Sequence, residues 1–338
     1  MRIKVNIPWK VRKAILTIEN VRHFLLSKIA TKRKKETTTI SFHCESHAIT
    51  GASIAIAAIA NLLSKHWSVE FIASAQSTYN QLLAPKIRRS HNISETAKIL
   101  IIDGQTPLEK IEKFRKSGKF VIISSHGILQ KNIKLKKANA ASLVHFVSTA
   151  QFQNIEAPPK NHFVIPNFCQ RIRKTKSTSN VGIVGRVHDP KKNVPAALSA
   201  AINSCAKEIH IWGDTAKITN SSRVVQHGWS YNKEEIYNSF DVLVSMSEEE
   251  SFGLTVIEAL SAGIPCVLSS IPAYQTFAEC PGVRIVRSCD SAAITEAINE
   301  LLTNKEDTRE ESIQYWITRY SEPAVEDKWI EKISAILA

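Results

Sequence analysis

The sequence contains no long hydrophobic run of the kind that crosses a membrane. Its longest apolar stretch, residues 54–63, is interrupted by Asn61 and ends at Ser64 and Lys65, whereas a spanning helix needs roughly 20 apolar residues. The start of the chain also lacks a continuous apolar segment followed by small residues at a cleavage site, so no signal peptide is expected. These absences predict a cytoplasmic protein.

Other absences disfavour whole classes of chemistry. The six cysteines are scattered without a CxxC pair, which argues against a zinc site or a disulfide framework and favours a reducing compartment. No G-x-G-x-x-G follows an expected strand and no Walker loop occurs, so NAD and ATP chemistry are disfavoured. The sequence also has no HExxH motif, DxD triplet or acidic metal cluster. We therefore expect neither a metal nor a cofactor.

Positive charge is concentrated at the start of the chain. The formal net charge is +13, and residues 1–37 hold 11 of the 44 Lys and Arg but only 2 of the 31 Asp and Glu. Apolar residues recur at helical spacing from Val11 to Ile29, which predicts an amphipathic helix. Such a helix suits an anionic membrane surface, and packing on the protein itself is the alternative. With only Trp9 and Phe24 available for base stacking, no nucleic-acid partner is expected.

The remaining chain has the length and pattern of two α/β domains. It alternates short apolar runs with helical patterns, which predicts βαβ units and a parallel sheet. A polar, basic stretch at 170–179 separates two such series, so we predict domains at 38–170 and 171–338. Strands are expected at Thr39–Cys44, Val69–Ala73, Ile99–Asp103, Phe120–Ser124, Leu143–Ser148, Phe163–Ile165, Val181–Val184, Ile209–Trp212, near Val225, at Val242–Ser245 and at Cys266–Leu268. Helices are expected at Ala52–Ser64, Leu108–Lys116, Pro195–Cys205, Lys233–Phe240, Leu254–Ala262 and Val325–Leu337.

One segment of the second half has the chemistry to hold a diphosphate between two carboxylates. Glu250 and Glu258 flank Phe252 and Gly253, where a helix is expected to begin. A helix N-terminus offers free N–H groups and the positive end of the helix dipole, both of which favour phosphate. The rise from Gly253 to Glu258 is about 7.5 Å, comparable to the span from a sugar across a pyrophosphate to a ribose. Taken alone, two glutamates are more often solvated surface residues.

This segment resembles the E-x-F-G-x-x-x-x-E signature of retaining nucleotide-sugar glycosyltransferases with the GT-B fold, in family four, the glycosyl transferases group 1. The small residues, Gly and Pro that follow the signature in that family are matched by Ala259, Ser261, Ala262, Gly263 and Pro265. The resemblance implies two Rossmann-like domains that face each other across a cleft. It also implies that Phe252, Gly253, Leu254 and Glu258 bind the donor, with Glu250 at the hexose.

A second stretch, residues 184–193, resembles the family's G-R-x-x-x-x-x-K-G element. By this resemblance Arg186 and Lys192 bind the donor diphosphate, and together they would neutralise a leaving nucleotide without a metal. Lys191 is an alternative to Lys192, and Asn193 stands where the family has Gly. A basic loop after a strand is, by itself, more often merely solvated.

The N-terminal half follows the family only in outline. Gly51 matches the glycine loop, where close backbone approach to the donor favours a residue without Cβ. His126 follows an expected strand, and related enzymes carry a His there that contacts the donor sugar; a structural or solvent-facing role is the equal alternative. The resemblance further implies that the last helix packs back onto the N-terminal domain.

Together these features predict a hexosyltransferase that moves a sugar from a nucleotide-diphosphate-sugar to an acceptor hydroxyl with retention. The expected acceptor is a glycan or a lipid-linked molecule of surface polysaccharide or glycolipid synthesis, met at the inner face of the membrane. The alternative is a catalytically degenerate scaffold or regulatory protein, although the charged signature residues Arg186, Lys192, Glu250 and Glu258 are all present.

Overall fold

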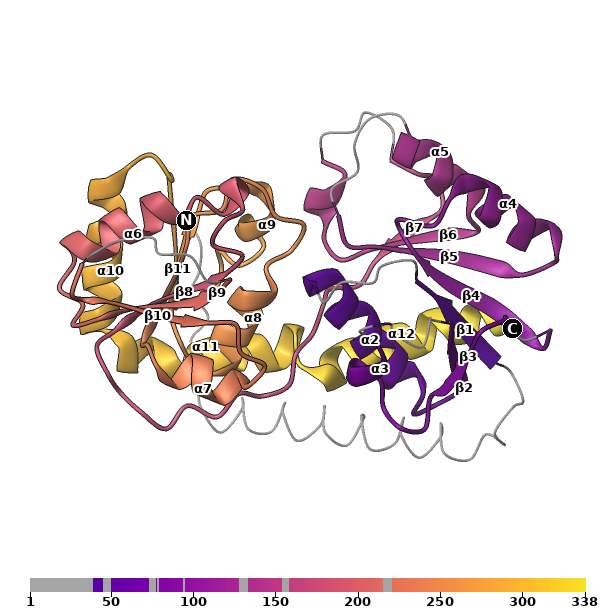
Figure 1. Cartoon of the computed structure of the whole chain (residues 1–338), viewed down its shortest axis with the longest axis horizontal. Helices are drawn as coiled ribbons and strands as arrows, with labels where there is room; N and C mark the ends of the chain where they lie inside the picture. Colours follow the sequence, from indigo (N-terminus) through magenta and orange to yellow (C-terminus); the bar gives the residue numbers. More distant parts are fainter. Residues whose placement is uncertain are drawn as a thin grey trace, which may run out of the picture.

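The computed structural model describes residues 39–338, except for 45–49, 73–76, 78, 94, 128–132, 154–157 and 215–220. The amphipathic segment expected within residues 1–37 lies outside the described residues. The described chain forms two parallel sheets with their helices, placed one beside the other along the long axis of the molecule (Figure 1). No helix in this part of the chain is long and apolar enough to cross a membrane.

The first sheet has, in the described residues, seven parallel strands in the order β3-β2-β1-β4-β5-β6-β7. Its central strands read as near-continuous apolar runs because helices cover both faces of the sheet. The strands are β1 (Thr39–His43), β2 (Ser68–Ile72), β3 (Arg88–Ser90), β4 (Ala97–Asp103), β5 (Phe120–Ser125), β6 (Leu143–Phe146) and β7 (His162–Val164). The helices are α2 (Gly51–Leu63), α3 (Tyr79–Leu82), α4 (Leu108–Lys116) and α5 (Ile133–Ala140), followed by the 3-10 turn η1 (Thr149–Gln151).

The second sheet has, within the described ranges, six parallel strands in the order β10-β9-β8-β11-β12-β13. Its strands are β8 (Val181–Gly185), β9 (Ile209–Gly213), β10 (Val224–Gly228), β11 (Val242–Ser245), β12 (Cys266–Ser269) and β13 (Val283–Val286). The other elements are η2 (Pro190–Lys192), α6 (Val194–Asn203), α7 (Lys233–Asn238), α8 (Leu254–Ser261), α9 (Pro272–Gln275), α10 (Ser291–Thr303), α11 (Lys305–Arg319) and α12 (Glu322–Leu337). These two Rossmann-like sheets are the architecture of the GT-B fold expected from the sequence.

In both sheets the strand order reverses beside the first strand of the domain. The chain steps from β1 outward to β2 and β3 and then returns to β4 on the other side, and it repeats this path with β8, β9, β10 and β11. Ligands of open parallel sheets bind outside the carboxyl ends of the strands at such a switch point. Each sheet therefore offers one edge where a site is expected.

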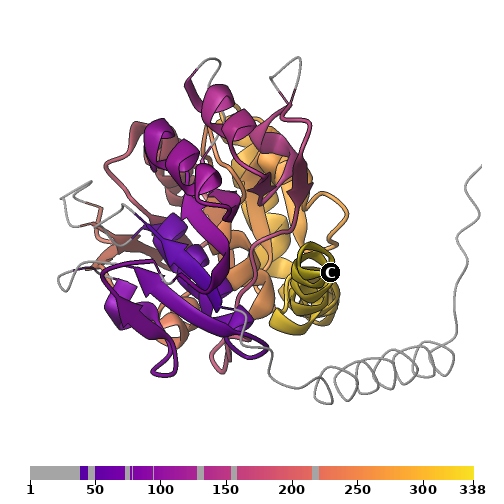
Figure 2. The ribbon, with the colours of Figure 1, turned by 90° about the vertical axis from the view of Figure 1, so that its right-hand side faces the viewer.

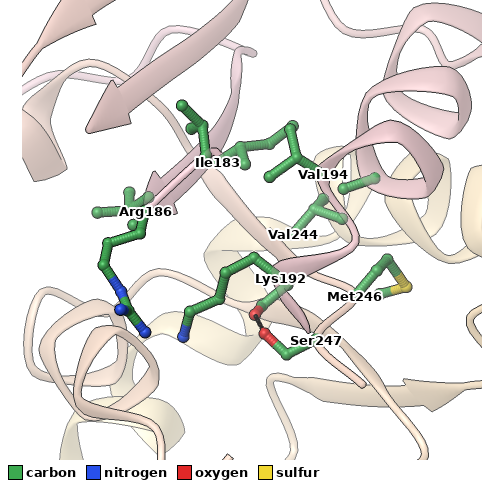
Figure 3. Close-up of a pocket in the computed structure, with 12 residues that line it drawn as sticks. Ile183, Arg186, Lys192, Val194, Val244, Met246 and Ser247 are labelled. Atoms are coloured by element: carbon green, nitrogen blue, oxygen red, sulfur yellow. Dashed lines mark hydrogen bonds between the residues drawn. The ribbon is translucent and has the colours of Figure 1, made fainter. Parts of the chain in front are cut away.

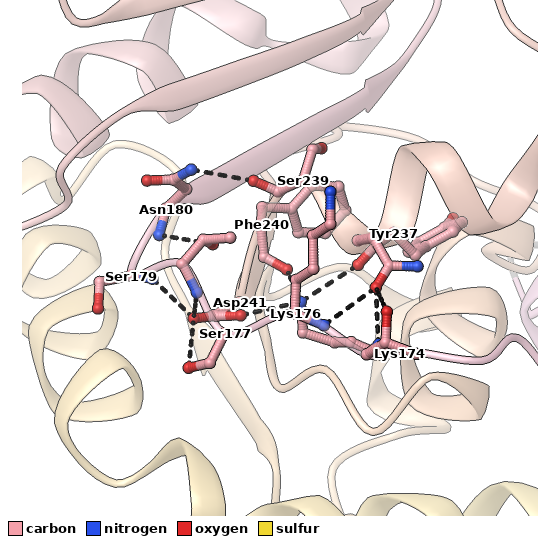
Figure 4. A network of polar contacts seen from close by, with 12 residues as sticks. Lys174, Lys176, Ser177, Ser179, Asn180, Tyr237, Ser239, Phe240 and Asp241 are labelled. Carbon is pink, nitrogen blue, oxygen red and sulfur yellow. Dashed lines mark hydrogen bonds and ion pairs between the residues drawn. The ribbon is translucent and has the colours of Figure 1, made fainter.

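The polar stretch at 170–179 is fixed to the second domain by a buried ion pair (Figure 4). Lys174 Nζ lies 2.9 Å from Asp241 Oδ1, and both side chains are almost completely buried. Lys174 also donates to the carbonyl of Phe240 at 2.7 Å, while Asp241 Oδ2 accepts from the backbone N–H groups of Thr178 and Ser179, both at 2.7 Å. These bonds compensate for the cost of burying two charges. The residue bounds of the two domains stay a prediction.

The chain passes between the domains twice, and the two crossings lie side by side. Cys169 pairs with Ser321 in an isolated parallel bridge, and its N–H donates to the carbonyl of Tyr320 at 3.2 Å. After the second crossing, α12 runs along the N-terminal domain and packs against α2 (Figure 1, Figure 2). Trp329 and Ile333 of α12 are fully buried in the hydrophobic core of that domain. The C-terminal helix thus belongs structurally to the first domain.

Candidate functional site

Two helix N-termini meet between the two sheets. α2 begins after β1 and α8 begins after β11, so both starts lie at the switch-point edges. A Cβ atom placed on Gly51 would lie 3.2 Å from Leu254 Cδ1, which puts the first residues of the two helices in contact. Both termini direct N–H groups and the positive dipole end towards this junction, an arrangement that favours a bound anion.

The α2 terminus is set by a capping box. Ser53 N donates to Thr50 Oγ1 at 3.2 Å, and Thr50 N donates to Ser53 Oγ at 2.7 Å. Each residue thereby satisfies a backbone donor of the other, which fixes where the helix starts. Gly51 is therefore the first helical residue, and it lies against Leu254 of the second domain.

Glu250 lies in a polar cluster beside Lys192. Its carboxylate forms an ion pair with Lys192, accepts from Ser247 Oγ at 3.2 Å and lies 3.5 Å from Tyr274 OH. Burial, and next the nearby charge of Glu250, raises the pKa of Tyr274 far above its usual range, so the phenol stays protonated. The structure thus brings together two of the residues that the sequence assigned to the donor, one from each signature element.

Gly253 and Phe252 give the signature loop its shape. Gly253 has φ +118 and caps α8, and a Cβ there would lie 2.9 Å from Tyr274 Cε1, so both conformation and space favour glycine. Phe252 is 2% exposed and packs its ring against Phe277 and Tyr320. The Phe252 side chain therefore anchors the loop in the core, and its backbone is the part near the junction.

Glu258 is held by two residues of α7 that the sequence did not identify. Tyr237 OH donates to Glu258 Oε2 at 2.7 Å, and Lys233 Nζ lies 3.0 Å from the same carboxylate. Burial raises the pKa of Tyr237 well above its usual value, which keeps the phenol a donor. Lys233 and Tyr237 are four residues apart and share one face of α7. That spacing is visible in the sequence, but the carboxylate partner is not.

Arg186 and Lys192 line a small pocket at the end of β8, together with Gly185, Ser245 and Ser247 (Figure 3). Both long side chains extend from the loop towards the same region. The Arg186 side chain is 65% exposed and its Nη2 lies 2.7 Å from Asp189 Oδ2. The exposed guanidinium keeps donors available for a ligand, because a single carboxylate does not use all five of its N–H groups.

The loop after β8 places Lys191, Lys192 and Asn193 in different environments. Lys191 pairs with Glu249 at 2.7 Å on the surface, whereas Lys192 pairs with Glu250, so Lys192 is the lysine that faces the cluster. Asn193 adopts φ +44 and ψ +45, a left-handed conformation that Asn tolerates better than most residues. Glycine also adopts this conformation readily, so the Asn at this position does not exclude the loop shape that a Gly would allow.

His126 follows β5 and is tied to the second domain through its backbone. Ser251 Oγ donates to the carbonyl of His126 at 2.7 Å, and the carbonyl of Ser251 accepts from Ser148 Oγ at 2.5 Å. Ser251 lies between Glu250 and Phe252 in the signature, so His126 lies against the signature loop. The His126 side chain lines a cavity of ≈ 280 Å³ with Ile56, Asp103, Ile123, Lys137 and Val144.

The ring of His126 contacts Ser124, which in turn contacts His145. Its Nε2 lies 3.0 Å from Ser124 Oγ, which is 2.9 Å from His145 Nδ1. Burial lowers the pKa of His126 to about 3 and that of His145 to about 4, so both rings are neutral at physiological pH. In the described residues no cluster of three His, Cys, Asp or Glu side chains is arranged to hold a metal ion.

Comparison with known proteins gives one family and many solved structures. Residues 178–304 match the family model described as glycosyl transferases group 1. HepE of Anabaena in complex with UDP and glucose has a TM-score of 0.74 at 17% identity, covering 88% of this chain and 99% of that chain. Sucrose-phosphate synthase from Thermosynechococcus elongatus gives 0.72 at 13% identity, covering 89% and 99%.

A third similar structure is the apo form of the lipopolysaccharide outer core galactosyltransferase WaaB, with a TM-score of 0.66 at 16% identity, covering 88% of this chain and 99% of that chain. At these identities the structural likeness concerns the fold. The comparison with curated protein sequences gives no significant match. The matched residues, 178–304, include Arg186, Lys192, Glu250 and Glu258.

Proposed function

We propose that this chain, a GT-B glycosyltransferase of the glycosyl transferases group 1 family, transfers a hexose from a nucleotide-diphosphate-sugar to an acceptor hydroxyl with retention. The observation that carries the proposal is the ion pair of Lys192 with Glu250, which joins the loop of Arg186 and Lys192 to the signature loop before α8. The first residue of α8, Leu254, in turn lies against Gly51 at the start of α2. Two cations and two helix dipoles at one junction match the charge of a diphosphate. We expect the diphosphate to bind there.

The same groups explain how the reaction would be accelerated. Negative charge on the diphosphate grows as the glycosidic bond breaks, so cations fixed beside it stabilise the transition state more than the ground state. Lys192 is held in place by Glu250 before any donor arrives. Preorganisation of this kind avoids the cost of orienting the cation during the reaction.

The two signature carboxylates would hold the two ends of the donor. Glu250, in its cluster with Ser247 and Tyr274, would accept from hexose hydroxyls. Glu258 would accept from ribose hydroxyls, with its orientation set by Tyr237 and Lys233. Hydroxyl groups recognised by carboxylates give charge-assisted hydrogen bonds, which are stronger than neutral ones.

The names of similar proteins favour a donor and an acceptor class. HepE is described in complexes with UDP and glucose and with UDP-glucose, and WaaB as a galactosyltransferase of the lipopolysaccharide outer core. We therefore propose a UDP-hexose as the donor and a glycan or lipid-linked molecule of surface polysaccharide or glycolipid synthesis as the acceptor. Docking of residues 1–37 on the inner face of the membrane would bring the enzyme to such an acceptor.

A thermal-shift panel of UDP-, GDP- and ADP-sugars tests the donor. A ligand that binds only the folded protein raises Tm by mass action, even when the acceptor is missing. We expect one UDP-hexose to give the largest rise, and the Arg186→Ala, Lys192→Ala double variant to give a smaller one. If no sugar nucleotide raises Tm, the proposal is wrong. Binding without detectable hydrolysis or transfer would instead favour the degenerate scaffold.

A further inference from the structure

A line of hydrogen bonds leads from the backbone of the first domain to the ring of His126. His145 Nε2 lies 2.9 Å from the carbonyl oxygen of Ile165, and His145 Nδ1 lies 2.9 Å from Ser124 Oγ. Ser124 Oγ lies 3.0 Å from His126 Nε2. Beyond that point, His126 Nδ1 is buried and has no hydrogen-bond partner among the described residues.

The chemistry of these groups sets the direction of every bond. A carbonyl oxygen only accepts, so His145 Nε2 carries a hydrogen. Because burial lowers the pKa of His145 to about 4, the ring is neutral and its Nδ1 is an acceptor. Ser124 must then donate its single hydrogen to His145 Nδ1, and its oxygen is left to accept from His126 Nε2.

His126 is consequently neutral, with its one hydrogen on Nε2. Burial lowers the pKa of His126 to about 3, so a second hydrogen is absent at physiological pH. The unpaired Nδ1 therefore presents a lone pair. A buried acceptor without a partner costs free energy, and a ligand that donates a hydrogen bond would remove that cost.

The resemblance to the family already implies that His126 contacts the donor sugar. We propose that Ser124 and His145 are positioning residues that fix its ring in the Nε2–H tautomer, so that Nδ1 meets a sugar hydroxyl only as an acceptor. This inference rests on the proposed function. It identifies the chemistry of the ligand atom, because a lone pair attracts a hydroxyl and repels a phosphate oxygen. His126 would thus recognise the sugar and leave the diphosphate to Arg186 and Lys192.

The surrounding structure holds this arrangement from both domains. The His145 ring packs edge-on against Trp329 of α12, with centroids 4.7 Å apart, and stacks on Phe163 at 5.2 Å. The backbone of His126 is fixed by Ser251 of the signature loop. Residues of the first domain therefore set the tautomer of His126. The signature loop of the second domain, which also carries Glu250, fixes the position of its backbone.

Nitrogen-15 NMR of the full chain labelled at histidine tests the tautomer without any substrate. In the unaltered protein we expect neutral Nε2–H signals for both His126 and His145 from pH 5.5 to 8. Ser124→Ala should leave His126 with a mixture of tautomers, while Ser124→Thr, which keeps the hydroxyl, should retain the single one. Ser125→Ala is the matched control, since the Ser125 hydroxyl contacts the Gly127 carbonyl, and it should change nothing. An Nδ1–H tautomer or a cationic His126 at pH 7 would overturn the proposal.

A ligand titration tests the hydroxyl. The nucleotide-sugar that binds best in the thermal-shift panel should move the Nδ1 signal of His126, and its nucleoside diphosphate alone should not. An equal shift with both, or none with the bound sugar nucleotide, would contradict recognition of a hydroxyl.

Ser124→Ala should lower kcat/KM about threefold to tenfold, which corresponds to the free energy of one neutral hydrogen bond. Ser124→Thr should restore kcat/KM. The tautomer is measured without a donor. A thermal-shift panel with no binding sugar nucleotide would therefore refute the proposed function, whereas a wrong tautomer in the NMR spectra would refute this inference.

Discussion

The two domains build their parts of the site in different ways. In the second domain the site residues come from two short stretches, 185–193 and 248–258, and each stretch folds into one loop and the helix behind it. In the first domain the two residues come from separate elements, since Gly51 begins α2 and His126 follows β5, and each contacts a residue of the second domain. Gly51 lies against the side chain of Leu254, and the carbonyl of His126 accepts a hydrogen bond from Ser251.

This difference separates the tasks of the two domains. The second domain presents charged groups that are already paired, such as Lys192 with Glu250 and Glu258 with Lys233. The first domain presents a helix terminus and a neutral ring. In the proposed function, the cations that would meet the diphosphate are thus on one side of the junction, and the neutral ring of His126 is on the other.

The largest effect is expected from Lys192→Ala. Removing a preorganised charge that stabilises the leaving group typically costs about 10²–10³ in kcat, with a smaller change in donor affinity. Lys191→Ala is the matched control, because Lys191 pairs with Glu249 on the surface, and it should stay within about twofold, as most surface substitutions do. Turnover should also persist in EDTA. Equal losses in the two lysine variants would show that the loop acts only through its total charge.

A smaller effect is expected at the other end of the donor. Glu258→Ala should weaken donor binding about tenfold or more, because a hydrogen bond to a charged group contributes ~1.5–3 kcal/mol. Tyr237→Phe should lose less, since Lys233 still holds the carboxylate. Calorimetry with the nucleotide-sugar and with its nucleoside diphosphate should give the same factor for both. A loss confined to the nucleotide-sugar would place Glu258 at the hexose and contradict the ribose role.

Local sequence was sufficient for the loops of the second domain. Glu258 lies in α8 and Glu250 lies three residues before its N-cap Gly253, so one short stretch of chain determines where these residues lie relative to each other. The strand Val242–Ser245 and the helix Leu108–Lys116 were predicted at their observed bounds. Two missed elements, β3 (Arg88–Ser90) and α3 (Tyr79–Leu82), have three and four residues, too few for a periodic pattern. The sequence analysis also did not predict β13 or the longer helices α5, α10 and α11.

Contacts between separate helices and strands could not be predicted from the sequence. Ser124 meets His145 because β5 pairs with β6 in a register that sets these two residues opposite each other. Nothing local to either strand specifies that pairing. The same holds for α7, whose Tyr237 reaches Glu258 only because α7 and α8 pack together in the folded domain. Strand order and helix packing are tertiary properties, so these partners emerged only from the structure.

Gly51→Ala should lower activity without lowering thermal stability. Ala is a better helix former than Gly by about 1 kcal/mol, and Gly51 lies in the first turn of α2, so thermal stability should not fall. The new Cβ would lie 3.2 Å from Leu254 Cδ1, and we expect the two helix N-termini to move slightly apart, lowering kcat/KM a few-fold. Adding Leu254→Ala should recover part of the loss in the double variant. Additive losses in the double variant would show that the contact does not set the junction.

The smallest effect on donor chemistry is expected from removing residues 1–37, which lie outside the described residues. Each Lys or Arg near an anionic surface contributes about 1 kcal/mol, and this segment holds 11 of them. Co-sedimentation should therefore show strong binding of the full chain to anionic vesicles, weak binding to neutral ones, and loss in high salt, where the charges are screened. The shortened chain should stay in the supernatant and keep the same donor affinity, because every residue of the donor site lies beyond position 37. If the full chain also stays in the supernatant with anionic vesicles at low salt, the stripe from Val11 to Ile29 must pack on protein, and the membrane role should be abandoned.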